Sequence, residues 1–127
     1  MPMSRNPLNL VLRFLLELAA IVVFGIWGYS LTEDGTRFLL AFLFPVFFAT
    51  LWGVFAVRDD PSRSGKTVVG TPGAARLVLE LVLFIAATWM LFYLGHSTLG
   101  IIFGGAVLLH YILSWDRITW LLKQRGN

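Results

Sequence analysis

The chain has 127 residues, of which 57% are hydrophobic and 13% are charged. Because a soluble domain usually carries about 25% charged residues, this composition leaves too little polar surface to face water on all sides. The absence of cysteine excludes disulfides, thiolate chemistry and sulfur-based zinc sites. The net charge of +3 does not indicate nucleic-acid binding, since the basic residues flank apolar runs and suit orientation in a membrane.

Long apolar segments predict an all-α integral membrane four-helix bundle, a single transmembrane domain over residues 1–127. The expected helices cover residues 8–31, 37–57, 73–94 and 98–122. A span needs roughly 20 mostly apolar residues, and continuous runs favour helices over barrel strands. Asn6 with Pro7, and Thr71 with Pro72, suit the starts of the first and third helices. Pro45 is expected to kink the second helix or to free a carbonyl.

The distribution of basic residues predicts the orientation. Of the 10 Lys and Arg residues, all except Arg37 fall on the side of the two termini and of the longer loop, residues 58–71. By the positive-inside rule, the termini and this loop are expected in the cytoplasm.

Two segments of the chain resemble each other. Residues 12–18 (LRFLLEL) align with residues 75–81 (ARLVLEL), and the same offset carries Trp52 onto Trp115. This similarity predicts two tandem copies of a helical hairpin, related by an axis along the membrane normal. Chance similarity between leucine-rich helices is the alternative.

The charged residues within the spans are the candidate functional residues, because a charge at the centre of a span costs about 2.5–3.5 kcal/mol. Arg13 and Arg76 are expected near the inner edge of the hydrocarbon, with Glu17 and Glu80 one turn deeper. Glu ahead of the basic residue is the better intrahelical order, and here the order is reversed. We therefore predict crossed pairs, Arg13 with Glu80 and Arg76 with Glu17.

Three further polar residues are expected to join this intramembrane layer. His110 and Thr50 fall at the depth of the glutamates, and Ser114 lies one turn closer to the cytoplasm. Such a layer could move protons or bind a cation. It could equally be structural, with every hydrogen bond satisfied.

Small residues predict close helix contacts. Gly100 and Gly104 form a GxxxG motif in the fourth helix, and Ala49 and Gly53 share a face of the second. Such faces pack helices within one bundle or between two copies in a homodimer.

Several motifs are rejected. Residues 64–67 (SGKT) resemble the end of a phosphate-binding loop, but Asp60 stands where its first glycine is required, so no nucleotide is expected. Asp59 and Asp60 are interpreted as a solvated acidic pair. His96 and His110 lie at opposite depths and cannot share a metal. No nucleophile–base set is visible, so we expect no catalytic residue, no cofactor and no enzyme.

The pattern as a whole resembles the YrdB-like family of small bacterial four-helix membrane proteins, a domain of unknown function. The resemblance covers residues 9–122 and is carried by residues 12–18, by Trp52 and Gly53, and by residues 72–80 (PGAARLVLE). It implies a bacterial inner-membrane location and no known activity. Two functions follow as hypotheses. One is a small transporter or channel component, and the other is an assembly or interaction subunit in a homodimer or larger complex.

Overall fold

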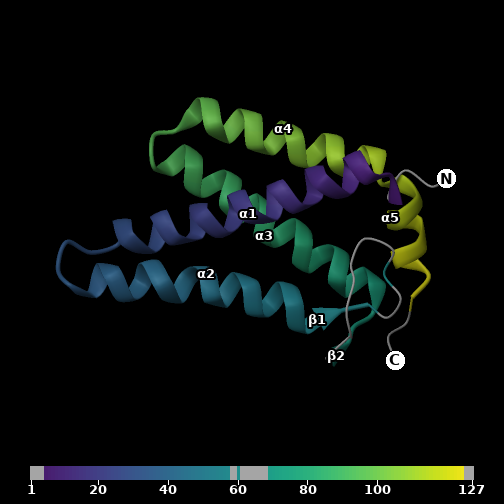
Figure 1. Ribbon diagram of the computed structural model, residues 1–127, viewed down its shortest axis with the longest axis horizontal. Coiled ribbons are helices and arrows are strands. Elements are labelled where there is room, and N and C mark those ends of the chain that lie inside the picture. Colours follow the sequence, from purple (N-terminus) through teal and green to yellow (C-terminus); the bar gives the residue numbers. More distant parts are fainter. Residues whose placement is uncertain (1–4, 58–59, 61–68, 125–127) are drawn as a thin grey trace.

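The computed structural model describes residues 5–57, 60 and 69–124 and is all-α apart from one short strand pair. In chain order the elements are α1 (Pro7–Ser30), α2 (Thr36–Val54), β1 (Phe55–Ala56), β2 (Val69–Gly70), α3 (Gly73–Tyr93), α4 (Ser97–Leu113) and α5 (Trp115–Leu122). The all-α prediction is confirmed (Figure 1). Most of the loop at residues 58–71 lies outside the described residues.

The starts of α1 and α3 show why these helices begin where they do. The Asn6 side chain accepts the Leu8 N–H at 2.9 Å and Pro7 occupies the first turn, so the predicted cap is confirmed. At α3 the residue before the helix is Pro72, and Thr71 is therefore not the cap. The Thr71 N–H instead donates to the Ala56 carbonyl at 2.9 Å, continuing the parallel β1–β2 pairing.

The predicted helix at residues 98–122 is wrong beyond residue 113. α4 and α5 are separated at Ser114 and meet at an angle of 69°. The Ser114 carbonyl accepts the N–H groups of Arg117 and Ile118, so it starts a new helix in a new direction. α5 consequently runs across the end of the other helices (Figure 1).

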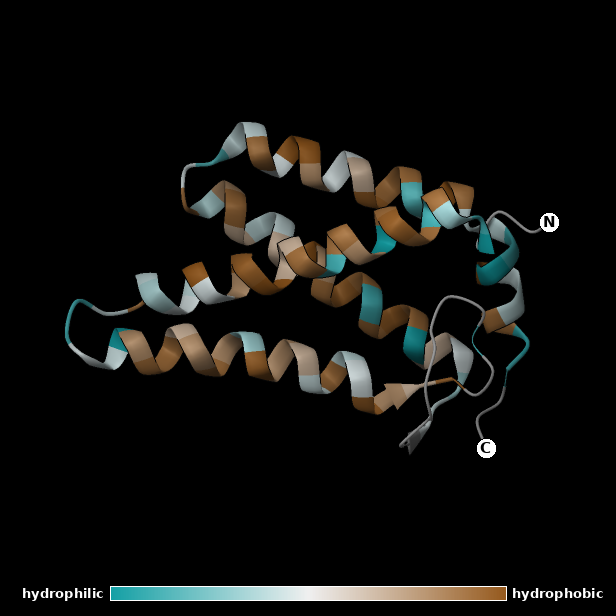
Figure 2. Ribbon diagram, in the orientation of Figure 1, coloured by the Kyte–Doolittle hydropathy of each residue, from teal (hydrophilic) through white to brown (hydrophobic). Residues whose placement is uncertain are grey.

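Three described helices, α1, α2 and α3, are long and apolar enough to cross a membrane, and α4 with α5 makes a fourth if the bent pair counts as one span. Hydrophilic residues within α1 and α3 are concentrated in the half of each helix nearer to α5 (Figure 2). The structure is thus compatible with a membrane protein that carries a polar cluster near one end of its spans.

Glycine allows α1 and α2 to pack closely. A Cβ at Gly28 would lie 2.3 Å from the Leu40 carbonyl oxygen, and one at Gly25 would lie 3.2 Å from Cγ of Pro45. Pro45 is accommodated inside a continuous α2 at this contact.

The GxxxG motif of α4 packs against α3 of the same chain. A Cβ at Gly100 would meet the Phe92 ring at 2.8 Å, and one at Gly104 would meet Cγ2 of Thr88 at 3.2 Å. On α2, Ala49 is exposed, and a Cβ at Gly53 would meet no atom within 4 Å. The predicted small face of α2 is therefore not used at these two positions to pack helices within the chain.

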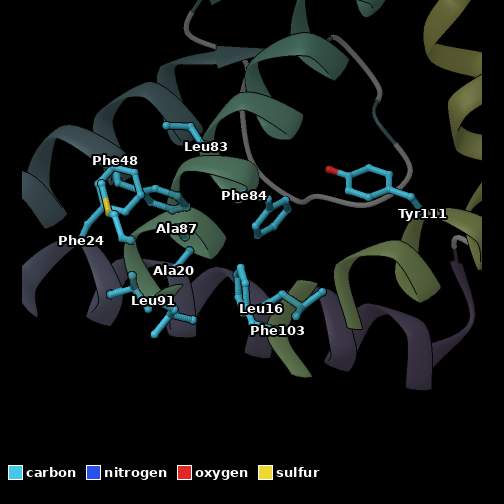
Figure 3. Close-up of a cluster of buried hydrophobic side chains, with 12 residues drawn as sticks. Leu16, Ala20, Phe24, Phe48, Leu83, Phe84, Ala87, Leu91, Phe103 and Tyr111 are labelled. Atoms are coloured by element: carbon cyan, nitrogen blue, oxygen red, sulfur yellow. The ribbon is translucent and has the colours of Figure 1, made fainter. Parts of the chain in front are cut away.

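The apolar core lies between α1, α3 and α4, and α2 contributes one buried residue, Phe48 (Figure 3). Phe48 packs edge-on against Phe24 with ring centroids 5.1 Å apart. Phe84 lies at the centre of this aromatic group, and Tyr111 lies at its edge toward the polar cluster. Because α2 contributes no other fully buried residue, a closed four-helix bundle is not confirmed. The tandem hairpin repeat stays a prediction.

Candidate functional site

Six charged residues form a buried cluster at the end of the spans where α5 lies. We call this set the ionic cluster: Arg13, Glu17, Asp60, Arg76, Glu80 and Arg117. Glu80 on α3 lies at its centre and has no exposed surface. Arg76 and Arg117 are each 1% exposed, so these guanidinium groups depend on protein partners rather than on water.

The Glu80 carboxylate accepts five hydrogen bonds of 2.7–2.9 Å from four residues. Its Oε1 accepts the Tyr111 hydroxyl at 2.7 Å and Nη1 of Arg117 at 2.9 Å. Its Oε2 accepts Nη2 of Arg13 at 2.9 Å, Nε of Arg76 at 2.7 Å and Nη2 of Arg117 at 2.7 Å. A carboxylate offers about four acceptor sites. Glu80 therefore has no acceptor site left for a further ligand.

Arg117 joins α5 to α3 and to the segment before β2. Its Nε donates to Oδ1 of Asp60 at 2.8 Å, its Nη2 donates to Oδ2 of Asp60, and the same guanidinium binds Glu80. Asp60 is 4% exposed. Its interpretation as half of a solvated acidic pair is therefore wrong, whereas Asp59 lies outside the described residues.

Trp52 at the end of α2 contacts two of the arginines. The guanidinium carbons of Arg13 and Arg76 lie 5.1 and 4.6 Å from the centre of its ring, within range of a cation–π interaction. Its indole N–H donates to Oε1 of Glu17 at 2.8 Å. Arg76 Nη1 also donates to the backbone carbonyls of Trp52 and Phe55, each at 2.6 Å, and so satisfies carbonyls at the C-terminal end of α2.

One of the two predicted crossed pairs forms. Arg13 on α1 binds Glu80 on α3 with Nη2 and Oε2 2.9 Å apart. The Arg76–Glu17 pair is wrong: Arg76 binds Glu80 of its own helix at 2.7 Å, and Glu17 binds Nε of Arg13 at 3.2 Å. The physical reason is that the α2 carbonyls and the Trp52 ring hold the Arg76 guanidinium next to Glu80.

His110 and Ser114 lie next to the ionic cluster, as predicted from their depth. Asn9 donates its amide N–H to Oγ of Ser114 at 2.8 Å and presents Oδ1 to Nδ1 of His110 at 2.9 Å. Nε2 of His110 faces Nη1 of Arg13 at 3.4 Å. An amide oxygen only accepts and a guanidinium only donates, so this arrangement requires neutral His110 with its proton on Nδ1.

Thr50 does not belong to this layer. Its side chain is exposed, and its hydroxyl donates to the Val46 carbonyl of its own helix at 2.7 Å. Five residues that touch the polar layer were not singled out from the sequence as its members: Asn9, Trp52, Asp60, Tyr111 and Arg117. The sequence did contain one signal for the burial of Arg117. It lies four positions before Leu121, so the two share a face of α5, and that face is opposite Trp115.

The fold and the site define a small helical protein whose long apolar helices suit a membrane and whose buried charges join three of its helices. The chain belongs to a family described as Protein of unknown function (DUF2568), whose model matches residues 11–108. Among curated proteins it is similar to one described as Uncharacterized protein YrdB of Bacillus subtilis (strain 168). The two are 40% identical over 119 residues, which cover 94% of this chain and 97% of the relative. The predicted YrdB-like family is thus confirmed. No solved structure matches the chain significantly.

Proposed function

We propose that the protein is a non-enzymatic, non-transporting membrane subunit, in which the ionic cluster is structural and fastens one end of the helices. The observation that carries this proposal is the full occupancy of Glu80, whose two oxygens accept from Arg13, Arg76, Arg117 and Tyr111. A group that relays protons or binds a cation must exchange one partner for another. At Glu80 such an exchange must break the hydrogen bonds of Arg13, Arg76, Arg117 or Tyr111, because all four already occupy its oxygens.

The charge balance and the histidine support the same proposal. The described cluster contains the arginines 13, 76 and 117 and the carboxylates 17, 60 and 80, so its formal charge is zero. The His110 ring has a partner at each nitrogen, since Nδ1 donates to Oδ1 of Asn9 and Nε2 faces Nη1 of Arg13. Neither feature leaves a site for a mobile charge.

The structural role predicts that reconstituted protein conducts no protons. In liposomes loaded with a pH-sensitive dye and given a pH gradient, the wild-type protein is expected to leave the gradient as stable as in protein-free vesicles. Glu17→Gln is the matched variant, because Glu17 is the most accessible carboxylate of the cluster, with 23% of its side chain exposed. A protonophore added at the end shows that the vesicles are sealed. Proton flux in the wild type that Glu17→Gln abolishes contradicts the proposal.

The role as a subunit rests on α2. Phe48 is its buried residue, and after Arg37 it carries no charge, so an equally apolar helix such as α2 of a second copy fits its surface. Phe42 lies on the exposed surface of α2. Since the chain has no cysteine, the single substitution Phe42→Cys is expected to form disulfide-linked dimers in oxidised membranes. Ile101→Cys on α4 is the control, with 66% exposure against 65% for Phe42. Equal cross-linking at both positions, or none at either, rejects α2 as the contact.

We propose further that the ionic cluster faces the cytoplasm. The charge bias supports this orientation, and Arg37, the one basic residue of the other side, stacks its guanidinium 3.9 Å from the Tyr29 ring at the far end of the α1–α2 hairpin. Alkaline phosphatase fused after Asn127 is expected to be inactive, because that enzyme needs the periplasm to fold. The same enzyme inserted after Glu33 is expected to be active, and the reverse pattern overturns the orientation.

A further inference from the structure

α5 is placed across the membrane spans rather than along them. It meets α4 at 69° and begins at the end of the spans that holds the ionic cluster (Figure 1). α4 without α5 has 17 residues, the lower limit for a spanning helix, and a segment at 69° to such a helix lies closer to the plane of the bilayer than to its normal. α5 therefore lies near one surface of a bilayer that these spans cross.

Three contacts hold α5 in this direction. Leu121 has no exposed surface, and its backbone carbonyl lies against Gly73, where a Cβ would come within 1.5 Å of the oxygen. The Gly73 N–H donates to the Gln124 carbonyl at 2.9 Å. Arg117 is bound to Glu80 and Asp60. α5 therefore cannot straighten into a continuation of α4 without breaking the ionic cluster.

The outward face of α5 is apolar. Trp115 and Leu122 are seven positions apart, about two helical turns, so they share a face. They are 65% and 59% exposed, whereas Arg117 and Leu121 on the opposite face are buried. An amphipathic helix that directs tryptophan and leucine away from the protein is the type that lies in a membrane interface.

This face continues the apolar surface of α4. Leu108 and Ile112 on α4 are 63% and 61% exposed, and Trp115 follows them at helical spacing directly after the chain turns at Ser114. The exposed Lys123 follows Leu122 and can reach lipid phosphates, while the indole of Trp115 suits the boundary between acyl chains and headgroups.

We propose that α5 is an interfacial helix whose Trp115–Leu122 face is bound by the headgroup layer of the bilayer, so that lipid, not a soluble protein, covers it. α5 thus anchors one end of the spans at a fixed depth, and through Arg117 it couples that depth to the ionic cluster. This inference rests on the membrane location of the chain. It does not depend on whether the cluster conducts or whether α2 contacts another copy.

The test measures the depth of α5 in vesicles of phosphatidylethanolamine and phosphatidylglycerol. The full-length Leu122→Cys variant is labelled with the fluorophore nitrobenzoxadiazole. The label attaches at this one position, because the natural chain has no cysteine. Its fluorescence is quenched in turn by iodide in water, by nitroxides on lipid headgroups and by nitroxides deep on acyl chains. Glu33→Cys in the α1–α2 turn is the water-exposed control, and Ile85→Cys, 64% exposed in the middle of α3, is the mid-membrane control.

At Leu122 the headgroup nitroxide is expected to quench most, and iodide is expected to quench several-fold less than at Glu33. Quenching by iodide equal to that at Glu33 places the face in water and overturns the proposal. Quenching mainly by the deep nitroxide, as at Ile85, makes α5 part of a span and overturns it too. Trp115→Cys repeats the measurement at the other end of the face, and an unfolding temperature equal to that of the wild type shows that α5 remains docked.

Discussion

Glu80→Gln is expected to lower the free energy of unfolding by about 3–5 kcal/mol, the usual cost of removing one partner from a buried ion pair. The amide is nearly the same size as the carboxylate, so packing is preserved and the change is one of charge. It leaves Arg13, Arg76 and Arg117 facing a neutral group without access to water, and the amide nitrogen adds a donor where only donors point. Thermal and denaturant unfolding in detergent micelles, followed by near-ultraviolet circular dichroism, measures the loss.

Two comparisons separate this effect from a general loss of charge. Glu17→Gln removes a partly exposed carboxylate with fewer partners, Arg13 and Trp52, and is expected to cost about 1–2 kcal/mol. Arg13→Gln combined with Glu80→Gln is expected to cost less than the sum of the two single changes, because the double variant removes both charges of one pair. Equal stability of the Glu80 and Glu17 variants, or strict additivity in the double variant, contradicts the central position of Glu80.

Gly73→Ala is expected to detach α5 from the start of α3 and to cost about 1–3 kcal/mol, the range for overpacking a close contact. The added Cβ would lie 1.5 Å from the Leu121 carbonyl oxygen and 2.4 Å from its carbon, both backbone atoms that no rotamer change can move. Detachment also exposes Arg117, which is otherwise buried. Trypsin is therefore expected to cleave after Arg117 much faster in the variant than in the wild type.

Gly105→Ala is the matched control for this prediction. Gly105 is also helical, but a Cβ there would meet no atom within 4 Å. The substitution is expected to be neutral or to stabilise the protein by up to about 1 kcal/mol through helix propensity. Cleavage after Arg117 at the same rate in all three proteins means that Gly73 does not control the docking of α5.

The long apolar runs were enough to predict α1, α2 and α3 within a few residues, because in lipid the backbone must satisfy its own hydrogen bonds. The last helix shows the limit of that reasoning. Residues 98–122 form one continuous helical pattern in the sequence, yet the chain turns at Ser114. The cause is tertiary: Arg117 binds Glu80 and Leu121 packs against Gly73, both on α3, and helical periodicity does not reveal these contacts.

The sequence predicted the members of the candidate site whose inclusion depends only on their depth along a span. It did not predict those whose inclusion depends on how a helix is rotated about its axis. Counting residues along each span brought Glu80 and His110 to one depth, with Arg13 one turn nearer the inner edge. The same count placed Thr50 with them, but α2 is apolar on all sides, so nothing in its pattern fixes which face turns inward, and Thr50 faces out. Asp60 lies in a loop without periodicity, so its burial against Arg117 could not be inferred from spacing.

The two intrahelical ion pairs, Arg13–Glu17 and Arg76–Glu80, also have a consequence for the insertion of the helices during synthesis. α1 emerges from the ribosome before α3 and α5 exist, so Arg13 enters the bilayer without Glu80. At that stage Glu17, 3.2 Å away on the same helix in the finished structure, is the counter-ion available to it. Arg76 and Glu80 balance each other's charge in the same way when α3 is inserted. Each helix can therefore leave the translocon with its charge already balanced, and the groups that later fasten the helices together first make each of them insertable.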